Sequence, residues 1–277
     1  MIDRPLAINA SNYVPFQPAS KWVGVKLRSS KHDKILQPGE RTMAFFSFLL
    51  TQLLFAYTIL VEPFLRTNFY RMLKKQLNID ATARLLFYRT QVLWEWSWVV
   101  VLILIVVPVQ QPLVWIGLTL PNQIGWIIMA ALLLGIGLST VLLRRNPGAM
   151  AAMQRSLEAS AILLPSTPTE RKWYAATAIT AGICEELLYR GFLMHYLPVT
   201  FPTLDWLFVA IISGIIYGLS HAYQGFKGIF QTALTGFSFA IVYVLSGSLL
   251  PAMVFHALAE LRTLMLWDPQ VKKKKAK

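Results

Sequence analysis

The feature that most constrains this chain is a group of ionisable residues inside an apolar run. Residues 174–197 are mostly apolar and, at about 1.5 Å per residue, are long enough as a helix to cross a bilayer. Glu185, Glu186 and Arg190 lie near the middle of this run. Each such residue costs about 2.5–3.5 kcal/mol at the centre of a membrane helix. A chain that keeps three of them must pair them with one another or place them along a polar cavity.

The composition is typical of a membrane protein that crosses the bilayer several times. Hydrophobic residues make up 56% of the 277 residues and charged residues 14%, and the mean hydropathy is +0.52. A single cysteine excludes an intramolecular disulfide. The net charge of +13 is explained more simply by basic cytoplasmic loops than by binding of nucleic acid. The polar, basic residues 1–42 show no signal peptide.

Apolar runs predict an all-α fold, a polytopic helical membrane protein with about seven or eight transmembrane helices and a polar cavity within the membrane. The candidate spans are 43–61, 92–108, 123–143, 174–197, 204–221, 228–245 and 249–267.

The charge of the loops predicts the orientation of these spans. Basic loops alternate with loops that lack basic residues, and Lys and Arg favour the cytoplasmic side. This places 144–173, 222–227 and the C-terminal tail in the cytoplasm. The Lys-rich tail, residues 268–277, also predicts affinity for anionic lipids.

The first span does not fit this alternation, because basic residues flank it on both sides. Either 43–61 is a re-entrant hairpin, or the N-terminus lies outside, or part of 62–90 also crosses. Residues 64–90 alternate apolar and basic side chains, which predicts an amphipathic helix on the membrane surface. A solvated helix between two spans is the alternative.

Helical spacing predicts which of the polar residues in the fourth span face one another. Glu186 and Arg190 are four residues apart, so they share a face and can form an ion pair. Glu185 points about 100° away from Glu186. It is therefore expected to be free to face a cavity, with no evident structural partner.

Three further candidates lie on other spans. His221 ends the fifth span, and His256 and Glu260 share a face of the seventh. We expect them to converge with Glu185 between the fourth, fifth and seventh spans. Cys184 is interpreted as a packing residue and His195 as an interfacial one. Ser220 is not expected to be a serine nucleophile, because it diverges from the adjacent His221 on a helix.

Such a group of residues suits the activation of water. A carboxylate in a low-dielectric pocket can act as a general base, and histidines can donate hydrogen bonds to an oxyanion. The alternative is a divalent metal such as zinc, held by His221, His256 and Glu185, with Glu260 as a further ligand. The cofactor is therefore either none or a divalent metal. The zinc-protease motif H-E-x-x-H is absent from the sequence.

Residues 170–267 resemble the CAAX-protease and bacteriocin-processing family of intramembrane endopeptidases, also called the Abi family. The motifs that carry the resemblance are Glu185-Glu186-x-x-x-Arg190, Tyr217-x-x-x-His221 and His256-x-x-x-Glu260, in this order and on separate spans. The resemblance implies a helical membrane fold whose polar chamber opens to the cytoplasm. It also implies a membrane protein or peptide as substrate.

The resemblance also implies roles for the site residues. Glu185 corresponds to the glutamate that activates water, supported by Glu186 and Arg190. His221 and His256 would orient water and stabilise the oxyanion. Tyr217 stands where the family usually has Phe, and Glu260 where it usually has Asn or Asp. Because an ionised Glu cannot donate a hydrogen bond, Glu260 is protonated, a metal ligand, or a sign of weakened catalysis.

Two other functions stay open from the sequence. A family member without catalysis would act as a membrane scaffold, an assembly factor with partners in a membrane complex, or a bacteriocin-immunity protein. A transporter would use the buried charges as a proton relay. The expected organisation is a basic N-terminal region over 1–42, membrane helices over 43–169 with the amphipathic segment 64–90, a protease-like core over 170–267, and the tail 268–277.

Overall fold

The computed structural model of the chain describes residues 38–107, 112–158 and 160–269, and these residues form helices and no strand. This confirms the predicted all-α fold. The expected N-terminal region, residues 1–42, lies mostly outside the described residues, as does nearly all of the Lys-rich tail.

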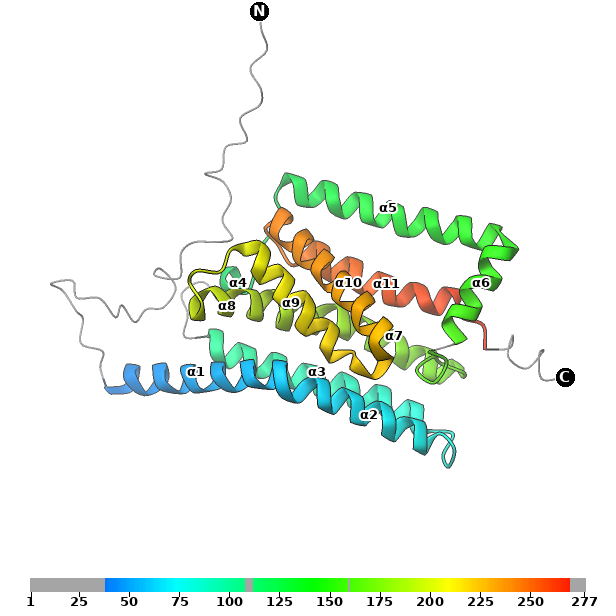
Figure 1. The fold of residues 1–277 in the computed structure, drawn as a ribbon, viewed down its shortest axis with the longest axis horizontal. Helices are drawn as coiled ribbons and strands as arrows, with labels where there is room; N and C mark the ends of the chain where they lie inside the picture. The colour runs from blue at the N-terminus through cyan, green and yellow to red at the C-terminus, as the bar shows by residue number, and fades with distance from the viewer. Residues whose placement is uncertain (1–37, 108–111, 159, 270–277) are drawn as a thin grey trace, which may run out of the picture.

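The described part of the chain begins with one long continuous helix (Figure 1). It consists of α1 (Pro38–Ala56), the π-helical turn η3 (Tyr57–Val61) and α2 (Glu62–Gln76). Pro63, in the first turn of α2, has no N–H to donate to the preceding turn, and a π-helical turn changes the hydrogen-bond register at that point. The helix therefore continues through the proline, and the first apolar run is not a re-entrant hairpin.

A short turn then reverses the chain into α3 (Ala83–Val106), which runs back along the first helix (Figure 1). The backbone N–H and hydroxyl of Thr82 donate to Asp80 at 2.7 and 2.8 Å. These bonds lower the pKa of the exposed Asp80 carboxyl. Residues 64–90 are thus divided between α2, this turn and α3. The expected single amphipathic helix on the membrane surface is wrong, because the Asp80–Thr82 bonds favour a turn in its middle.

The remaining helices follow in the order α4 (Pro112–Trp115), α5 (Gln123–Arg145), α6 (Pro147–Glu158), α7 (Pro168–Glu186), the π-helix η4 (Leu187–Leu193), α8 (Met194–Thr200), α9 (Trp206–Ser220), the 3-10 turn η5 (Ala222–Gln224), α10 (Gly225–Ser246) and α11 (Leu250–Leu266).

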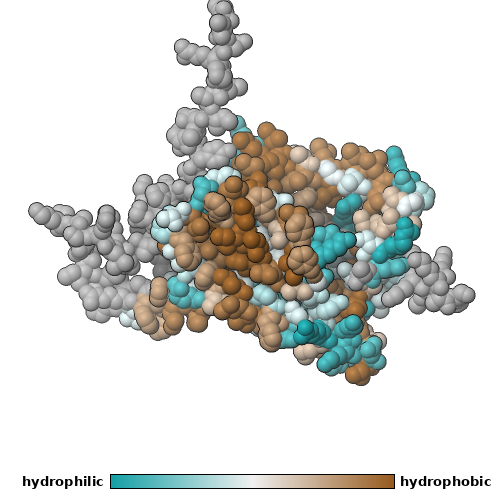
Figure 2. Space-filling view, in the orientation of Figure 1, coloured by the Kyte–Doolittle hydropathy of each residue, from teal (hydrophilic) through white to brown (hydrophobic). Residues whose placement is uncertain are grey.

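Among the described residues, four helices are long and apolar enough to cross a membrane: Phe45–Gln76, Ala83–Val106, Gln123–Arg145 and Ala222–Ser246. Trp206–Ser220, the predicted fifth span, is a shorter apolar helix. The predicted fourth and seventh spans correspond to α7–η4–α8 and to α11, which carry the ionisable residues. The chain is thus a helical integral membrane protein. Apolar side chains cover much of the surface drawn in Figure 2, as contact with lipid requires.

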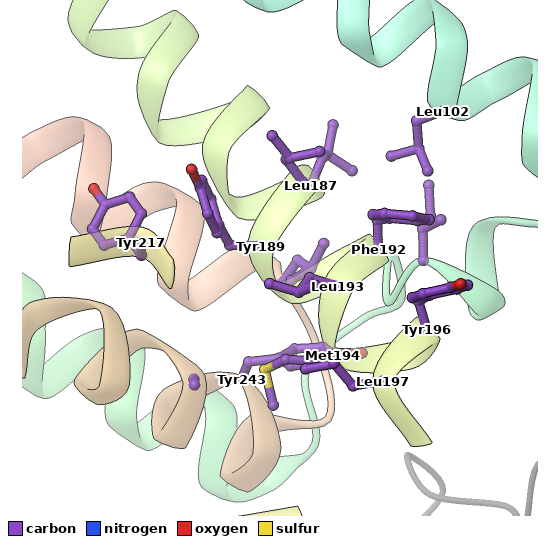
Figure 3. Close-up of a cluster of buried hydrophobic side chains, with 14 of the residues drawn as sticks. Leu102, Leu187, Tyr189, Phe192, Leu193, Met194, Tyr196, Leu197, Tyr217 and Tyr243 are labelled. Atoms are coloured by element: carbon purple, nitrogen blue, oxygen red, sulfur yellow. The ribbon is translucent and has the colours of Figure 1, made fainter. Parts of the chain in front are cut away.

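The core lies around η4 and α8. Tyr189, Phe192, Leu193 and Met194 are completely buried there (Figure 3). Helix α7 packs against α3 on one side and α11 on another. The approach of α7 to α11 is close at Gly182, where a Cβ atom would lie 2.7 Å from the backbone nitrogen of Ala257. A side chain at position 182 would therefore force apart the two helices that carry Glu185 and His256.

We predict that Gly182→Ala lowers the stability of the fold, since overpacking of this kind costs about 1–3 kcal/mol. The matched control is Gly135→Ala on α5, where an added Cβ meets no atom within 4 Å. That change should be neutral or stabilise by up to about 1 kcal/mol through helix propensity. The measurement is the apparent melting temperature of the purified variants in detergent. Equal melting temperatures for the two variants would contradict the close approach.

Candidate functional site

The two glutamates end α7, immediately before η4 begins at Leu187. A π-helical segment of this kind is frequent at functional sites. Glu185 and Glu186 point to different sides of the helix and have different partners. The predicted divergence of their side chains is therefore present in the structure.

Glu186 belongs to a completely buried ion pair. Arg190 Nη1 lies 2.9 Å from Glu186 Oε1, and neither side chain is exposed to solvent. Arg190 Nη2 also donates to the carbonyl of Gly236 at 2.7 Å. The ion pair predicted from helical spacing is thus present, and a backbone carbonyl on α10 adds to it.

Position 236 is a glycine for a steric reason. A Cβ atom there would lie 2.7 Å from the ring of Tyr217 and 3.1 Å from Arg190 Nη2. The guanidinium also lies over the rings of Tyr217 and Phe239, 4.8 and 5.3 Å from their centroids. These contacts hold Arg190 between α7, α9 and α10.

His256 links this ion pair to Glu185. Its Nδ1 lies 3.0 Å from Glu186 Oε1, which orients the ring. The other nitrogen, Nε2, lies 3.5 Å from the hydroxyl of Tyr217 and 3.9 Å from Glu185 Oε2. The last distance is too long for a direct hydrogen bond and is in the range that a single water can bridge.

Glu185 has a partner that the sequence analysis did not identify. Arg66 Nη2, on α2, lies 2.7 Å from Glu185 Oε1, so the expectation of no structural partner for Glu185 is wrong. The same guanidinium lies 2.8 Å from Glu62 and 3.6 Å from Glu95. Arg66 is one of the basic residues that follow the first predicted span, 43–61. The four-residue spacing of Glu62 and Arg66 was the signal that pointed to a buried pair.

His221 is held by the end of its own helix. Its Nδ1 lies 3.0 Å from the carbonyl of Tyr217 and 3.1 Å from the hydroxyl of Ser220. If Nδ1 donates to the carbonyl, Nε2 is available to other groups. The hydroxyl of Ser220 donates to the carbonyl of Tyr217 at 2.8 Å.

Glu260 lies one turn beyond His256 on α11 and is exposed. Its Oε2 accepts a hydrogen bond of 3.2 Å from the hydroxyl of Tyr174, which lies on α7. Tyr174 is a further site residue that the sequence analysis did not select. Its position in the first turns of the helix that carries Glu185 was the available signal.

A cavity of about 280 Å³ brings the predicted residues together. It is lined by residues of α2, α3, α6, α7, α9 and α11, by the segment 160–164, by His221 and by η5. The lining includes Arg66, Glu95, Tyr174, Glu185, Tyr217, His256 and Glu260. Glu186 and Arg190 do not line it and lie behind Glu185 and His256. Cys184 is buried and does not line it either. Its position agrees with the interpretation as a packing residue.

The arrangement does not suit a metal ion. Within the described residues, no group of three or more His, Cys, Asp or Glu side chains is placed to hold one. One oxygen of Glu185 is engaged by Arg66, whose positive charge opposes a second cation. The alternative in which His221, His256 and Glu185 bind zinc therefore does not fit this geometry.

The fold and the site define an integral membrane protein with a buried glutamate, two histidines and a polar cavity between helices. Residues 168–261 match the family model described as Rce1-like, type II CAAX prenyl endopeptidase. This confirms the resemblance, and the matched segment contains all six predicted site residues. The part of the chain that carries the predicted site is thus similar to the type II CAAX prenyl endopeptidases. No curated protein and no solved structure matches the chain.

Removal of Arg190 should strongly destabilise the protein. Arg190→Met would leave the carboxylate of Glu186 buried with only His256 as a partner, and breaking a buried ion pair in this way costs about 3–5 kcal/mol. The double variant Glu186→Gln with Arg190→Met removes both charges and should recover part of the loss. Thermal unfolding in detergent, followed by tryptophan fluorescence, measures both. A double variant as unstable as the sum of the two single variants would show that the pair is not coupled.

Proposed function

We propose that the protein is an intramembrane endopeptidase that hydrolyses peptide bonds of membrane-associated proteins or peptides with a water molecule activated by Glu185. One observation carries this proposal. Glu185 is buried, and it lines a cavity of about 280 Å³ together with His221 and His256. A buried carboxylate beside two histidines supplies a general base and hydrogen-bond donors at one place.

Each oxygen of Glu185 has its own task in this mechanism. Oε1 is bound by Arg66, which leaves Oε2 toward His256 Nε2 at 3.9 Å. A water between these two atoms transfers a proton to Oε2 while its oxygen bonds to the carbonyl carbon of the substrate. The C–N bond then breaks, and the proton on Glu185 passes to the leaving nitrogen. The products are a carboxylic acid and an amine, and Glu185 is again a carboxylate.

The histidines and Tyr217 act on the tetrahedral intermediate. Glu186 accepts from His256 Nδ1 and favours the protonated ring, whose Nε2–H then donates to the oxyanion. The hydroxyl of Tyr217, 3.5 Å from the same nitrogen, is a second donor. His221 Nε2 orients the water. An ionised Glu260 cannot donate to an oxyanion, so we assign it to holding Tyr174 at the cavity.

Glu185→Gln should abolish cleavage, because the amide cannot accept the proton from water. We expect a loss of about 10²–10⁴-fold, as for other general bases. The assay uses purified protein in detergent with a panel of peptides that includes C-terminally prenylated CAAX peptides, with and without a chelator. The adjacent variant Cys184→Ala is the control, and it should retain activity because Cys184 does not line the cavity.

Three outcomes would contradict this mechanism in different ways. Full activity of Glu185→Gln would exclude Glu185 as the base. Loss of wild-type activity in the chelator would favour a metal enzyme. Membrane partners that remain bound to Glu185→Gln and His256→Ala, with no cleavage by the wild type, would favour the scaffold or assembly function.

We infer that the end of the molecule with the α2–α3 turn faces the cytoplasm. The C-terminal end of α11 and the basic ends of α2 and α5 lie at this same end (Figure 1). The turn before α9 lies at the opposite end and carries no basic residue. The positive-inside rule then places the C-terminus, and with it the Lys-rich tail, near the anionic lipids of the cytoplasmic leaflet.

Cysteine labelling in intact cells tests this orientation. In a Cys184→Ala background, Thr203→Cys should react with a membrane-impermeant maleimide, and Asp80→Cys should react only after permeabilisation. Both positions are exposed and lie in turns at opposite ends of the bundle (Figure 1). The reverse labelling pattern would invert the proposed topology.

A further inference from the structure

We propose that Arg66 is a positioning residue for Glu185 and that the first long helix thereby completes the active site. This proposal rests on the function proposed above. Arg66 and its anchor Glu62 lie on α2, outside the segment 168–261 that matches the endopeptidase family. The domain defined by the family match thus lacks the cation nearest to its own base.

Four side chains connect α2 to α7 and η4. Arg66 Nη2 binds Glu185 at 2.7 Å, and Arg66 Nε binds Glu62 Oε1 at 2.8 Å. The other oxygen of Glu62 accepts a bond of 2.8 Å from the hydroxyl of Tyr189. Tyr189 in turn lies four residues after Glu185, as Arg66 lies four residues after Glu62. Two spacings of one helical turn on facing helices therefore close a ring of contacts.

The ring is buried and is next to both π-helical segments, with Tyr189 inside η4. Glu62 and Glu185 are 3% and 4% exposed, and Tyr189 is fully buried. Segment η3 ends at Val61, directly before Glu62, and η4 begins at Leu187, directly after the two glutamates. Each π-helical turn shifts the angular register of the residues beyond it, which sets the direction of the side chains on that face. The ring thus depends on the local geometry of both helices.

A third carboxylate steadies the guanidinium from the side of α3. Glu95 Oε1 lies 3.6 Å from Arg66 Nη2 and accepts a bond of 2.6 Å from Gln91. Arg66 is therefore held at Nε by Glu62 and at Nη2 by Glu95 and Glu185. A cation fixed from two helices can fix Glu185 in turn, because its own side chain has little freedom left.

The contact with Arg66 determines which oxygen of Glu185 faces the reacting water. With Oε1 bound to Arg66, Oε2 points to His256 Nε2 across 3.9 Å. Without Arg66 the carboxylate is free to rotate, and its buried negative charge loses its nearest cation. The water and the scissile carbonyl would then meet a base in the wrong place, and a displacement of about 1 Å can cost about 10²-fold in rate.

The test replaces Arg66 in the whole chain and measures kcat and KM separately. Arg66→Met keeps most of the length of the side chain without its charge and should lower kcat about 100-fold with KM unchanged. Arg66→Lys restores a cation without the planar fork and should recover part of kcat. Arg84→Met is the matched control. Arg84 forms a similar interhelical pair with Glu170 at 3.1 Å and is equally shielded, at 12% exposure against 11% for Arg66, but has no contact with Glu185.

The control distinguishes a positioning role from a loss of folding. Arg84→Met should lower the melting temperature and leave kcat near that of the wild type. If Arg66→Met has the same melting temperature and the same kcat as Arg84→Met, the ion pair of Arg66 with Glu185 has only a structural role, and the proposal is overturned. A raised KM with unchanged kcat in Arg66→Met would instead make Arg66 a substrate-binding residue. A raised kcat in this variant would mean that Arg66 inhibits Glu185 in the wild type. Either result also overturns the proposal.

Comparison of Arg66→Met with Glu185→Gln distinguishes a failure of this proposal from a failure of the proposed function. If Glu185→Gln is inactive and Arg66→Met is fully active, the positioning role alone is wrong. If Glu185→Gln is fully active, the general-base mechanism is wrong whatever Arg66 does. Should Arg66→Met fail to fold, Glu62→Gln removes the anchor without removing the cation, and it should lower kcat in the same direction by a smaller factor. Wild-type kcat in folded Glu62→Gln would then overturn the proposal.

Discussion

The structure depends on the neutralisation of buried negative charge. Glu185 and Glu186 are adjacent in an apolar setting, and each is compensated by a separate arginine, Arg66 from α2 and Arg190 from η4. A buried carboxylate without such a partner is strongly destabilising. The two pairs therefore fix where α2, α7 and η4 lie relative to one another. The cavity forms beside them, between α2, α3, α6, α7, α9 and α11.

The two ion pairs have different consequences for chemistry. Arg190 and Glu186 are fully enclosed, with Gly236 and His256 as their other partners, so they are suited to support and not to react. The pair of Arg66 and Glu185 borders the cavity and leaves one carboxylate oxygen toward His256. One sequence motif thus supplies both a support and a candidate base, because adjacent residues on a helix face different surroundings.

The helices outside the family match have a direct part in this arrangement. The matched segment supplies the glutamates, both histidines and Glu260, whereas Glu62, Arg66 and Glu95 come from the first two long helices. The small cavity beside Trp98 is lined by the same three residues together with Cys184 and Glu185. The N-terminal helices are therefore part of the polar interior, and the matched segment considered without them would lack the cation that pairs with Glu185.

The features that follow from local geometry were predictable without the structure. Apolar run length predicted the helices, and a spacing of four residues predicted the pair of Glu186 and Arg190, because one helical turn fixes which side chains share a face. Two expectations were wrong, one because a turn interrupts the predicted helix and the other because a distant segment supplies the partner. The helix over 64–90 is broken by the bonds between Asp80 and Thr82, and Glu185 is paired with Arg66. The pairing of Glu185 with Arg66 could not be predicted from spacing, because it depends on which helices pack together, and packing is set by side chains along the whole chain.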